Sequence, residues 1–442
     1  MAALPEAAML QLLINLNMLA QRADAEAREA REARQAAQAQ AQARVRRRRR
    51  PRWWVRTWST QQRRLSFGHW DNLLRELRAE DAESYFNYLR MTPELFEEIL
   101  HRIEPAISRQ NTRWRESIPA GLKLAVTLRH LASGELYPTL QFQFRISKKT
   151  ITKFVPQVCQ AIHQEFVDEV MHLPQDSDGW KAVAAEFQRK WNVPHAIGAL
   201  DGKHVRIKKP VHSGSLYHNY KGFFSVVLMA LVDADYKFLY TDVGGQGHMS
   251  DCQIFNASEL KDALDAGDLH LPDPDPMPND DQDTPYFILG DDAFALRVHL
   301  MKPFSQRALT RDLRIYNYRI SRGRRVVENA FGILARRFQC FLGTLQQTPQ
   351  VVIQMVHAAI CLHNLMRLRM PAALRDRHLD REDDDHQLIP GAWRQDANMI
   401  PMDARHQGVR DLEVAKRQRQ TLVAYFNSPA GEVPWQARIV DA

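Results

Sequence analysis

The sequence has few cysteines, and none of them are spaced like disulfide partners. The chain of 442 residues contains 4 cysteines, and no two of them form a Cys-x-x-Cys pair. This excludes a small disulfide-stapled fold, argues against a structural zinc site and predicts a reducing compartment. His357 and Cys361 lie four residues apart in an apolar helical pattern, where packing in the core is favoured over metal ligation.

Long hydrophobic runs are also lacking near the start of the chain. The longest apolar patch there, residues 9–20, is interrupted by Gln11, Asn15 and Asn17. It is shorter than the ~20 residues that a membrane-spanning helix needs, and it lacks the basic flank of a signal peptide. We therefore expect no membrane association and no secretion signal. The glycine-rich residues 244–247 are not followed by Gly-Lys-Ser/Thr, which excludes a nucleotide-binding P-loop.

Acidic residues are outnumbered, and the basic excess is concentrated in one block. The chain has 60 Lys and Arg against 52 Asp and Glu, a formal charge of +8 and a pI near 9.3. Residues 44–58 hold a dense arginine run together with Trp53, Trp54 and Trp58. Such a block predicts nuclear import, phosphate binding or both, so we expect DNA as partner and the nucleus, with the cytoplasm second, as location.

Composition and pattern divide the chain into six segments. Hydrophobic residues make up 45% and charged residues 25%, an ordinary globular mixture for two or three domains. The last segment contains a helical pattern at 409–426 whose apolar face predicts docking on the core or on a second subunit of a homo-oligomer. The predicted segments are 1–43 (low-complexity, solvated helix or disorder), 44–65 (basic arm), 66–175 (helical), 176–195 (connecting helix), 196–370 (core) and 371–442 (tail).

The helical segment has the layout of a helix-turn-helix. Thr92-Pro93 starts one helix, residues 121–133 form a second, and Ser147 caps a third after a short segment. A tight turn followed by a helix with a basic first turn is typical of a DNA reader, and a plain helical bundle is the equal alternative. The candidate DNA-binding side chains on the third helix are Lys148, Lys149 and Lys153.

The core segment alternates strands and turns before it becomes helical. Apolar runs at 196–200, 223–232 and 236–243 are followed by a helical pattern at 251–266, a run at 286–290 and helices from 322 to 368. Residues 205–207 either extend the first strand or begin another after a turn at 201–202. This order is that of a ribonuclease-H-like α/β fold, a mixed sheet flanked by helices. Its catalytic acids lie after the first strand, after the fourth strand and on a later helix, which selects Asp201, Asp291 and Glu328.

Four acidic residues of this core mark a site. Asp201 and Asp291 each close an apolar run, Asp251 follows the glycine-rich residues 244–247, and Glu328 lies in a helical pattern. A buried carboxylate without a partner is costly, and converging carboxylates are usually relieved by a hard divalent cation. We therefore predict a nuclease core that uses Mg²⁺ or Mn²⁺. Alternatives are a helix N-cap for Asp251 and structural ion pairs for Asp201 and Glu328.

Several short motifs resemble those of the PIF/Harbinger transposase family and its domesticated nuclease relatives. The similarity runs from roughly residue 53 through the core. The motifs lie at residues 198–204 (GALDGKH), 219–225 (NYKGFFS), 247–251 (GHMSD), 290–294 (GDDAF), 301–304 (MKPF) and 324–332 (RxxxExxFG).

This resemblance implies a DDE-type, metal-dependent DNA endonuclease. It also implies that Asp201, Asp251, Asp291 and Glu328 all contribute to metal binding, and that a separate Myb-like protein can serve as DNA-targeting partner. From the charges, we expect two metal ions bridged by Asp201 and in-line attack on phosphorus. The candidate side chains for holding the DNA backbone are Lys203, His204, Arg206, Lys221 and Arg324, with ordinary surface charge or ion pairing as the alternative.

Two functions compete at this point. One is an active transposase or nuclease. The other is a domesticated nuclear DNA-binding or regulatory protein that retains the nuclease fold. A missing carboxylate would favour the second function, and all four acids are present. The sequence therefore favours catalysis.

Overall fold

The computed structural model describes residues 23–39, 56–113, 116–305, 309–372, 379–395, 400–401 and 412–441, in two compact units, 1–63 and 64–442. In the first unit, residues 23–39 form a helix whose side chains are all exposed, as an alanine-rich helix with little apolar face should be. The 3-10 turn η1 (Thr57–Ser59) follows, and α2 (Gln61–Phe67) crosses the unit boundary. The predicted arginine run and its first two tryptophans lie outside the described residues.

Two helices of the second unit begin at the caps that the sequence predicts. The hydroxyl of Thr92 accepts the backbone N–H of Leu95 with Pro93 in the first turn, and the Ser147 hydroxyl accepts the N–H of Thr150. These caps fix where the helices begin. The helices are α3 (Leu73–Glu80), α4 (Ala82–Leu89), α5 (Pro93–Ile107), α6 (Ala120–Ser133), α7 (Tyr137–Phe144), α8 (Lys148–Val170) and α9 (Ser177–Trp191).

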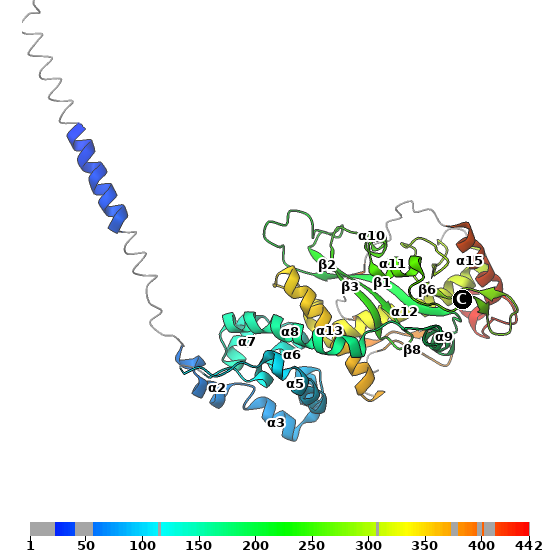
Figure 1. Cartoon of the computed structure of the whole chain (residues 1–442), viewed down its shortest axis with the longest axis horizontal. Coiled ribbons are helices and arrows are strands. Elements are labelled where there is room, and N and C mark those ends of the chain that lie inside the picture. Colours follow the sequence, from blue (N-terminus) through cyan, green and yellow to red (C-terminus); the bar gives the residue numbers. More distant parts are fainter. Residues whose placement is uncertain are drawn as a thin grey trace, which may run out of the picture. The chain divides into compact units, whose positions relative to one another are not determined.

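A mixed sheet lies at the centre of this unit (Figure 1). Its strand order is β3-β2-β1-β6-β7, with β1–β2 and β2–β3 antiparallel and β1–β6 and β6–β7 parallel. The short β10 pairs with the second half of β1. The strands are β1 (Ala196–Arg206), β2 (Ser225–Val232), β3 (Phe238–Gln246), β6 (Phe287–Leu289), β7 (Leu300–Met301) and β10 (Ile400–Pro401).

Both faces of the sheet are covered, because alternate side chains of β2 belong to two different buried clusters. Val226, Leu228 and Ala230 belong to one buried cluster, whereas Val227 and Met229 belong to another. Because successive side chains of a strand point to opposite faces, a strand with apolar residues at every position must be buried on both sides. The first cluster includes α12 (Arg311–Arg337), α13 (Pro349–Arg369) and α8. The second includes α9, α10 (Asp251–Asn256) and α11 (Glu259–Ala266).

Helix α13 is long and apolar enough to span a membrane by length and composition. In the structure, however, 72% of its most apolar window is buried inside the protein, against β3 and α8. Side chains such as Val352, Val356 and Ile360 are fully enclosed. Each such burial contributes roughly 1.5–3 kcal/mol. The apolar character of α13 is therefore that of a core helix.

Three elements of the core run further than their local patterns indicate. Of the two alternatives for residues 205–207, extension of the first strand is confirmed: β1 continues through residues 201–202, so Asp201 lies in the middle of an eleven-residue strand and not at its end. The glycine-rich residues 244–246 belong to β3, and the turn after this strand lies at residues 247–248. Helix α12 begins at Arg311, eleven residues before the expected start at 322, because Thr310 caps it by accepting the N–H of Leu313. In each case pairing or capping extended an element beyond its local pattern.

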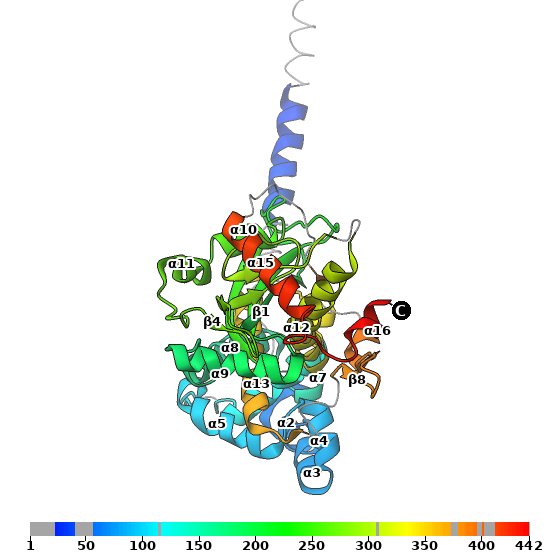
Figure 2. The ribbon, with the colours of Figure 1, turned by 90° about the vertical axis from the view of Figure 1, so that its right-hand side faces the viewer.

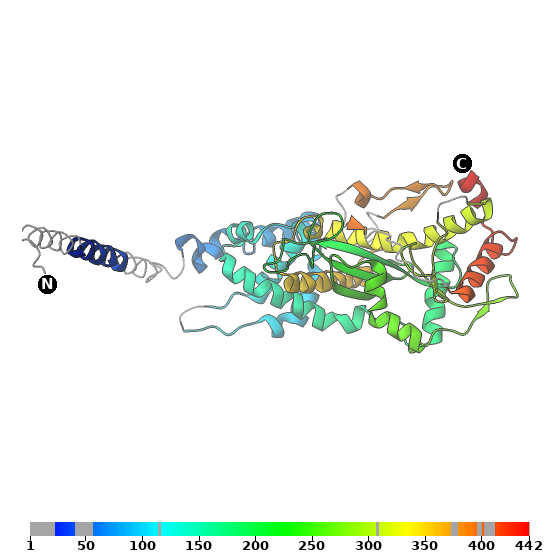
Figure 3. The same ribbon diagram turned by 90° about the horizontal axis from the view of Figure 1, so that it is seen from above.

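The tail returns to α12. Helices α15 (Glu413–Phe426) and α16 (Gln436–Asp441) pack on α12 (Figure 2), so the apolar face predicted at 409–426 docks on its own chain, with Leu412 left exposed. The hairpin β8–β9 lies beside the same helix (Figure 3), where Glu382 pairs with Arg322 and Arg325. The remaining elements are β4 (Asp275–Pro276), β5 (Asp283–Thr284), η2 (Gln339–Leu342), β8 (Arg381–Glu382), β9 (Leu388–Ile389) and η3 (Ala392–Gln395).

Candidate active site

Strand register brings Asp201 and Asp291 together. Ala199 of β1 pairs in parallel with Leu289 of β6, and Asp201 and Asp291 each lie two residues further along. Parallel strands that advance together keep these residues at the same level of the sheet. Asp291 lies two residues beyond the end of β6, and its Oδ1 accepts the backbone N–H of Ala293 at 2.9 Å, which orients the carboxylate.

The third carboxylate comes from the start of a helix. Ser250 caps α10 and forms a capping box with Gln253, so Asp251 is the first helical residue and not the N-cap that had been considered for it. Its side chain is fully buried, and neither Oδ1 nor Oδ2 has a hydrogen-bond partner. Buried carboxylates normally have partners, so two unpartnered oxygens in one side chain indicate a site for a cation.

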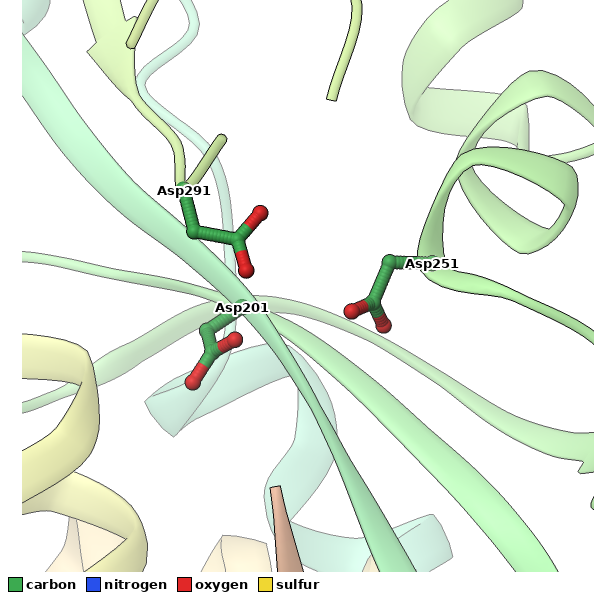
Figure 4. Close-up of side chains that lie close together, drawn as sticks. All are labelled: Asp201, Asp251 and Asp291. Carbon is green, nitrogen blue, oxygen red and sulfur yellow. The ribbon is translucent and has the colours of Figure 1, made fainter. Parts of the chain in front are cut away.

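Asp201, Asp251 and Asp291 form one acidic cluster (Figure 4). Each offers an oxygen within 4.8 Å of the oxygens of the other two. Burial, reinforced by the charges of Asp201 and Asp291, raises the pKa of Asp251 well above its ordinary value. Burial and the charge of Asp201 likewise raise the pKa of Asp291 from 3.8 to about 6. The protein alone therefore leaves the negative charge of the cluster poorly compensated.

A lysine provides part of the compensation. Lys203 Nζ lies 3.1 Å from Asp201 Oδ2, and both side chains are buried. The ammonium group also lies 5.6 Å from the centre of the Phe331 ring. Lys203 was predicted to hold the DNA backbone, but its charge faces inward, toward the acidic cluster. Its DNA contact stays a prediction, and its observed partner is Asp201.

Glu328 lies next to the acidic cluster and is not one of its three members. Its Oε1 forms an ion pair with Arg324 at 2.8 Å, one turn earlier on α12. Burial alone would lower the pKa of Arg324, but the charges of Glu328, Asp201 and Asp291 outweigh it and raise this pKa. The arginine therefore connects Glu328 electrostatically to the cluster. A role of Glu328 as a metal ligand stays a prediction.

The remaining candidate DNA-binding residues are divided between the interior and the surface. His204 is buried, and its Nδ1 hydrogen-bonds the Ser225 hydroxyl at 3.0 Å. Burial, with the charges of Lys221 and Lys203, lowers the pKa of His204 to about 4, so the ring is neutral near pH 7. The exposed members of the set are Arg206 at the end of β1, Lys221 in the loop before β2, and Lys148, Lys149 and Lys153 on α8.

The sequence did not predict that Trp393 and Arg394 of the tail would lie against α12 beside Glu328. Trp393 of η3 donates its indole N–H to Asn329 Oδ1 at 2.8 Å and covers Gly332, where any Cβ would meet the indole at 2.3 Å. Arg394 beside it lies 4.0 Å from Glu328 and pairs with Asp380. The signal that was available is Gly332 within a helix, because a glycine in a helix interior indicates close approach by another group.

The chemistry of the acidic cluster fits a divalent cation. The donors are carboxylate oxygens from three separate segments, which is the ligand type that Mg²⁺ and Mn²⁺ prefer. The unpartnered oxygens of Asp251 are available for coordination. Among the described residues this is the one group of three or more His, Cys, Asp or Glu side chains close enough to share an ion.

Comparison with known proteins agrees with this geometry. Residues 200–364, which contain all four predicted acids, match the family described as DDE superfamily endonuclease. The chain is 25% identical over 305 residues to "Putative nuclease HARBI1" of Bos taurus, covering 68% of this chain and 83% of the relative. The human protein of that name is 28% identical over 262 residues (59% and 70%). This chain is also 20% identical to "Protein ALP1-like" of Arabidopsis thaliana over 328 residues, which cover 72% of this chain and 80% of the relative. No solved structure matches the chain.

These matches confirm the resemblance read from the motifs. The family match, residues 200–364, contains all three aspartates of the acidic cluster and most of the central sheet. Residues 200–364 are thus similar to the DDE superfamily endonucleases, and a larger part of the chain is similar to proteins named "Putative nuclease HARBI1".

Proposed function

We propose that the chain is a divalent-metal-dependent DNA endonuclease of the PIF/Harbinger type. The observation that carries this proposal is the acidic cluster: Asp201, Asp251 and Asp291 converge from three segments, and the oxygens of Asp251 have no partner. A structural ion-pair network would leave each carboxylate with a cation or donor. The strand order β3-β2-β1-β6-β7 is that of a ribonuclease-H-like core and supports the same proposal.

The side chains of this chain have three tasks in that reaction. Asp201, Asp251 and Asp291, with Glu328 as a further candidate, would hold one or two Mg²⁺ or Mn²⁺ ions. Bound there, such ions activate water and stabilise the charge that develops on the phosphodiester and the leaving oxygen. Lys203 and Arg324 keep the carboxylates oriented and moderate their repulsion. Asp251 is fully buried, so bulk water has little access to its carboxylate. Electrostatic interactions of this carboxylate are therefore stronger than they would be in water.

DNA is the proposed substrate, and two further features support it. The chain carries an excess of basic residues, and Lys148, Lys149 and Lys153 lie exposed on α8. The helix-turn-helix read from the sequence lies between residues 121 and 170, where its short middle segment is the helix α7; the apolar face of α8 packs against α5, α6 and α13. We propose that the exposed basic face of α8 contacts phosphates. We also propose a nuclear location and a Myb-like targeting partner, which import assays and co-purification would test.

A cleavage assay tests the proposed reaction. Full-length protein, stripped with EDTA, is incubated with supercoiled plasmid in buffer alone, with Mg²⁺ and with Mn²⁺. We expect nicked and linear products only when metal is present, and none from Asp201→Asn. The matched control is Asp268→Asn, an exposed carboxylate outside the cluster, which should cleave like wild type. Equal cleavage by the Asp201 variant would refute the site. A wild-type protein that binds DNA without cutting it would support the regulatory alternative.

A further inference from the structure

The loop between β1 and β2, residues 207–224, combines basic charge with exposed aromatic and apolar side chains. Residues 202–232 contain no Asp or Glu, although the chain has 52 acidic residues in all. Arg206, at the end of β1, and Lys208, Lys209 and Lys221 in the loop are exposed, and Tyr220 is 36% exposed. The loop follows directly on the strand that carries Asp201. Charge of one sign is therefore segregated beside the acidic cluster.

Basic and aromatic side chains are paired along this loop. The Arg206 guanidinium lies 4.5 Å from the Phe223 ring centre, and Lys221 Nζ lies 5.2 Å from that of Tyr220. Lys209 Nζ lies 5.4 Å from the Phe224 ring centre. Cations held over rings present a surface that is both positive and planar. Proteins that bind single-stranded nucleic acid combine these two properties, with cations on phosphates and rings under bases.

Hydrogen bonds of the buried Asn219 side chain hold the tip of the loop in place. Asn219 is 1% exposed, and its Oδ1 accepts the backbone N–H groups of Lys221 and Phe223. Its Nδ2 donates to the Ser225 hydroxyl, which hydrogen-bonds His204 Nδ1. This buried chain of polar groups fixes the turn at residues 219–223. A rigid turn loses little conformational entropy when it binds a partner.

The loop is also fixed to the segment that carries Asp251. His248 Nδ1 hydrogen-bonds the Leu216 carbonyl at 2.8 Å. A Cβ at Gly247 would meet the Tyr217 carbonyl oxygen at 2.4 Å, so the two segments touch backbone to backbone. Asp251 follows only four residues after Gly247. The loop is thus joined to two of the three segments of the acidic cluster.

We propose that residues 206–224 form a nucleic-acid arm that holds one DNA strand for the acidic cluster, with Tyr220 stacking on a base and Arg206 and Lys221 on phosphates. This rests on the proposed endonuclease function and identifies the surface that holds the cut strand. It assigns His204 and Asn219 to support of the arm and not to DNA contact. The absence of acids from the arm favours a polyanion over a protein partner.

DNA binding without cleavage tests the arm. Full-length protein in EDTA is titrated into fluorescein-labelled single-stranded and duplex oligonucleotides, and anisotropy is followed from 50 to 200 mM salt. We expect Tyr220→Ala to weaken single-stranded binding about tenfold and Tyr220→Phe to restore it, since the ring and not the hydroxyl stacks. Lys221→Ala should lower the slope of log affinity against log salt by about one. Lys416→Ala on α15 is the control for charge.

The outcomes separate the arm from catalysis. The tip side chains lie at the surface, so each variant should keep the wild-type melting temperature, and a variant that melts early is replaced by Tyr220→Ser or Lys221→Gln. If Tyr220→Ala and Lys221→Ala bind DNA as tightly as wild type does, the proposed DNA-binding role of residues 206–224 is refuted, even when the wild-type protein cleaves DNA. If they lose binding while wild type fails to cleave, the arm stands and the endonuclease proposal fails.

Discussion

Replacing Asp291 by asparagine should stabilise the metal-free protein while weakening metal binding. In the folded protein, burial and the charge of Asp201 raise the pKa of Asp291 to about 6, against 3.8 ordinarily. Each pKa unit corresponds to ~1.4 kcal/mol, so keeping this carboxylate charged at pH 8 costs the folded state about 3 kcal/mol. Asparagine has the same shape, carries no charge and can still accept the N–H of Ala293.

The pH dependence has a defined sign. Because the pKa of Asp291 is higher in the folded state than in the unfolded chain, the penalty is full above pH 6 and disappears as the pH falls below about 4. We therefore expect Asp291→Asn to raise the free energy of unfolding by up to about 3 kcal/mol at pH 8 in EDTA. Near pH 4 we expect the variant and wild type to be equal. Urea unfolding followed by tryptophan fluorescence at both pH values measures this.

Adding metal should reverse the order of stability. A ligand that binds only the folded state stabilises it in proportion to the logarithm of its concentration over its dissociation constant. Millimolar Mn²⁺ should therefore raise the wild-type midpoint more than that of Asp291→Asn, with Asp268→Asn behaving as wild type. If Asp291→Asn is no more stable than wild type at pH 8 without metal, or if metal stabilises both equally, the reading of the acidic cluster is wrong.

Three further substitutions test neighbouring features. Lys203→Met removes the buried ion pair with Asp201 and should destabilise the metal-free protein by about 3–5 kcal/mol. The same variant should bind Mn²⁺ more tightly in calorimetry, because the lysine no longer competes with the metal for Asp201. Glu328→Gln should abolish plasmid cleavage while the protein remains folded by circular dichroism; full cleavage would exclude Glu328 from the site. Gly247→Ala should lower stability by about 1–3 kcal/mol in thermal melts, since its Cβ would overlap a backbone oxygen, whereas Gly343→Ala, with open space around it, should not.

The parts of the site that could be predicted from sequence are those set by local pattern and motif. Asp201 and Asp291 were placed beside apolar runs, and a parallel pairing of those runs brings them together. The position of Asp251 could not be derived from strand order, because it depends on the irregular β2–β3 register and on the cap of α10. The inward direction of Lys203 follows from β1 continuing past Asp201, which the sequence offered as one of two alternatives.

Contacts between distant segments were beyond pattern reasoning. The pairing of β10 with β1 opposite Lys203 and His204 joins residues almost two hundred positions apart. The cover of Trp393 over α12 is similarly remote. Both depend on tertiary packing and carry little local signal. The ion pair of Arg324 with Glu328, at helical spacing, is the kind of contact that periodicity does predict.

The cover that the tail places over α12 and the edge of β1 also orders events in time. The chain is made from its N-terminus, so the three aspartates emerge long before residues 391–401 and the helices that follow them. Until residues 391–401 have been made, the second half of β1 lacks its pairing with β10, and Gly332 lacks the cover of Trp393. A chain that has been made only as far as residue 390 therefore lacks these contacts beside the site.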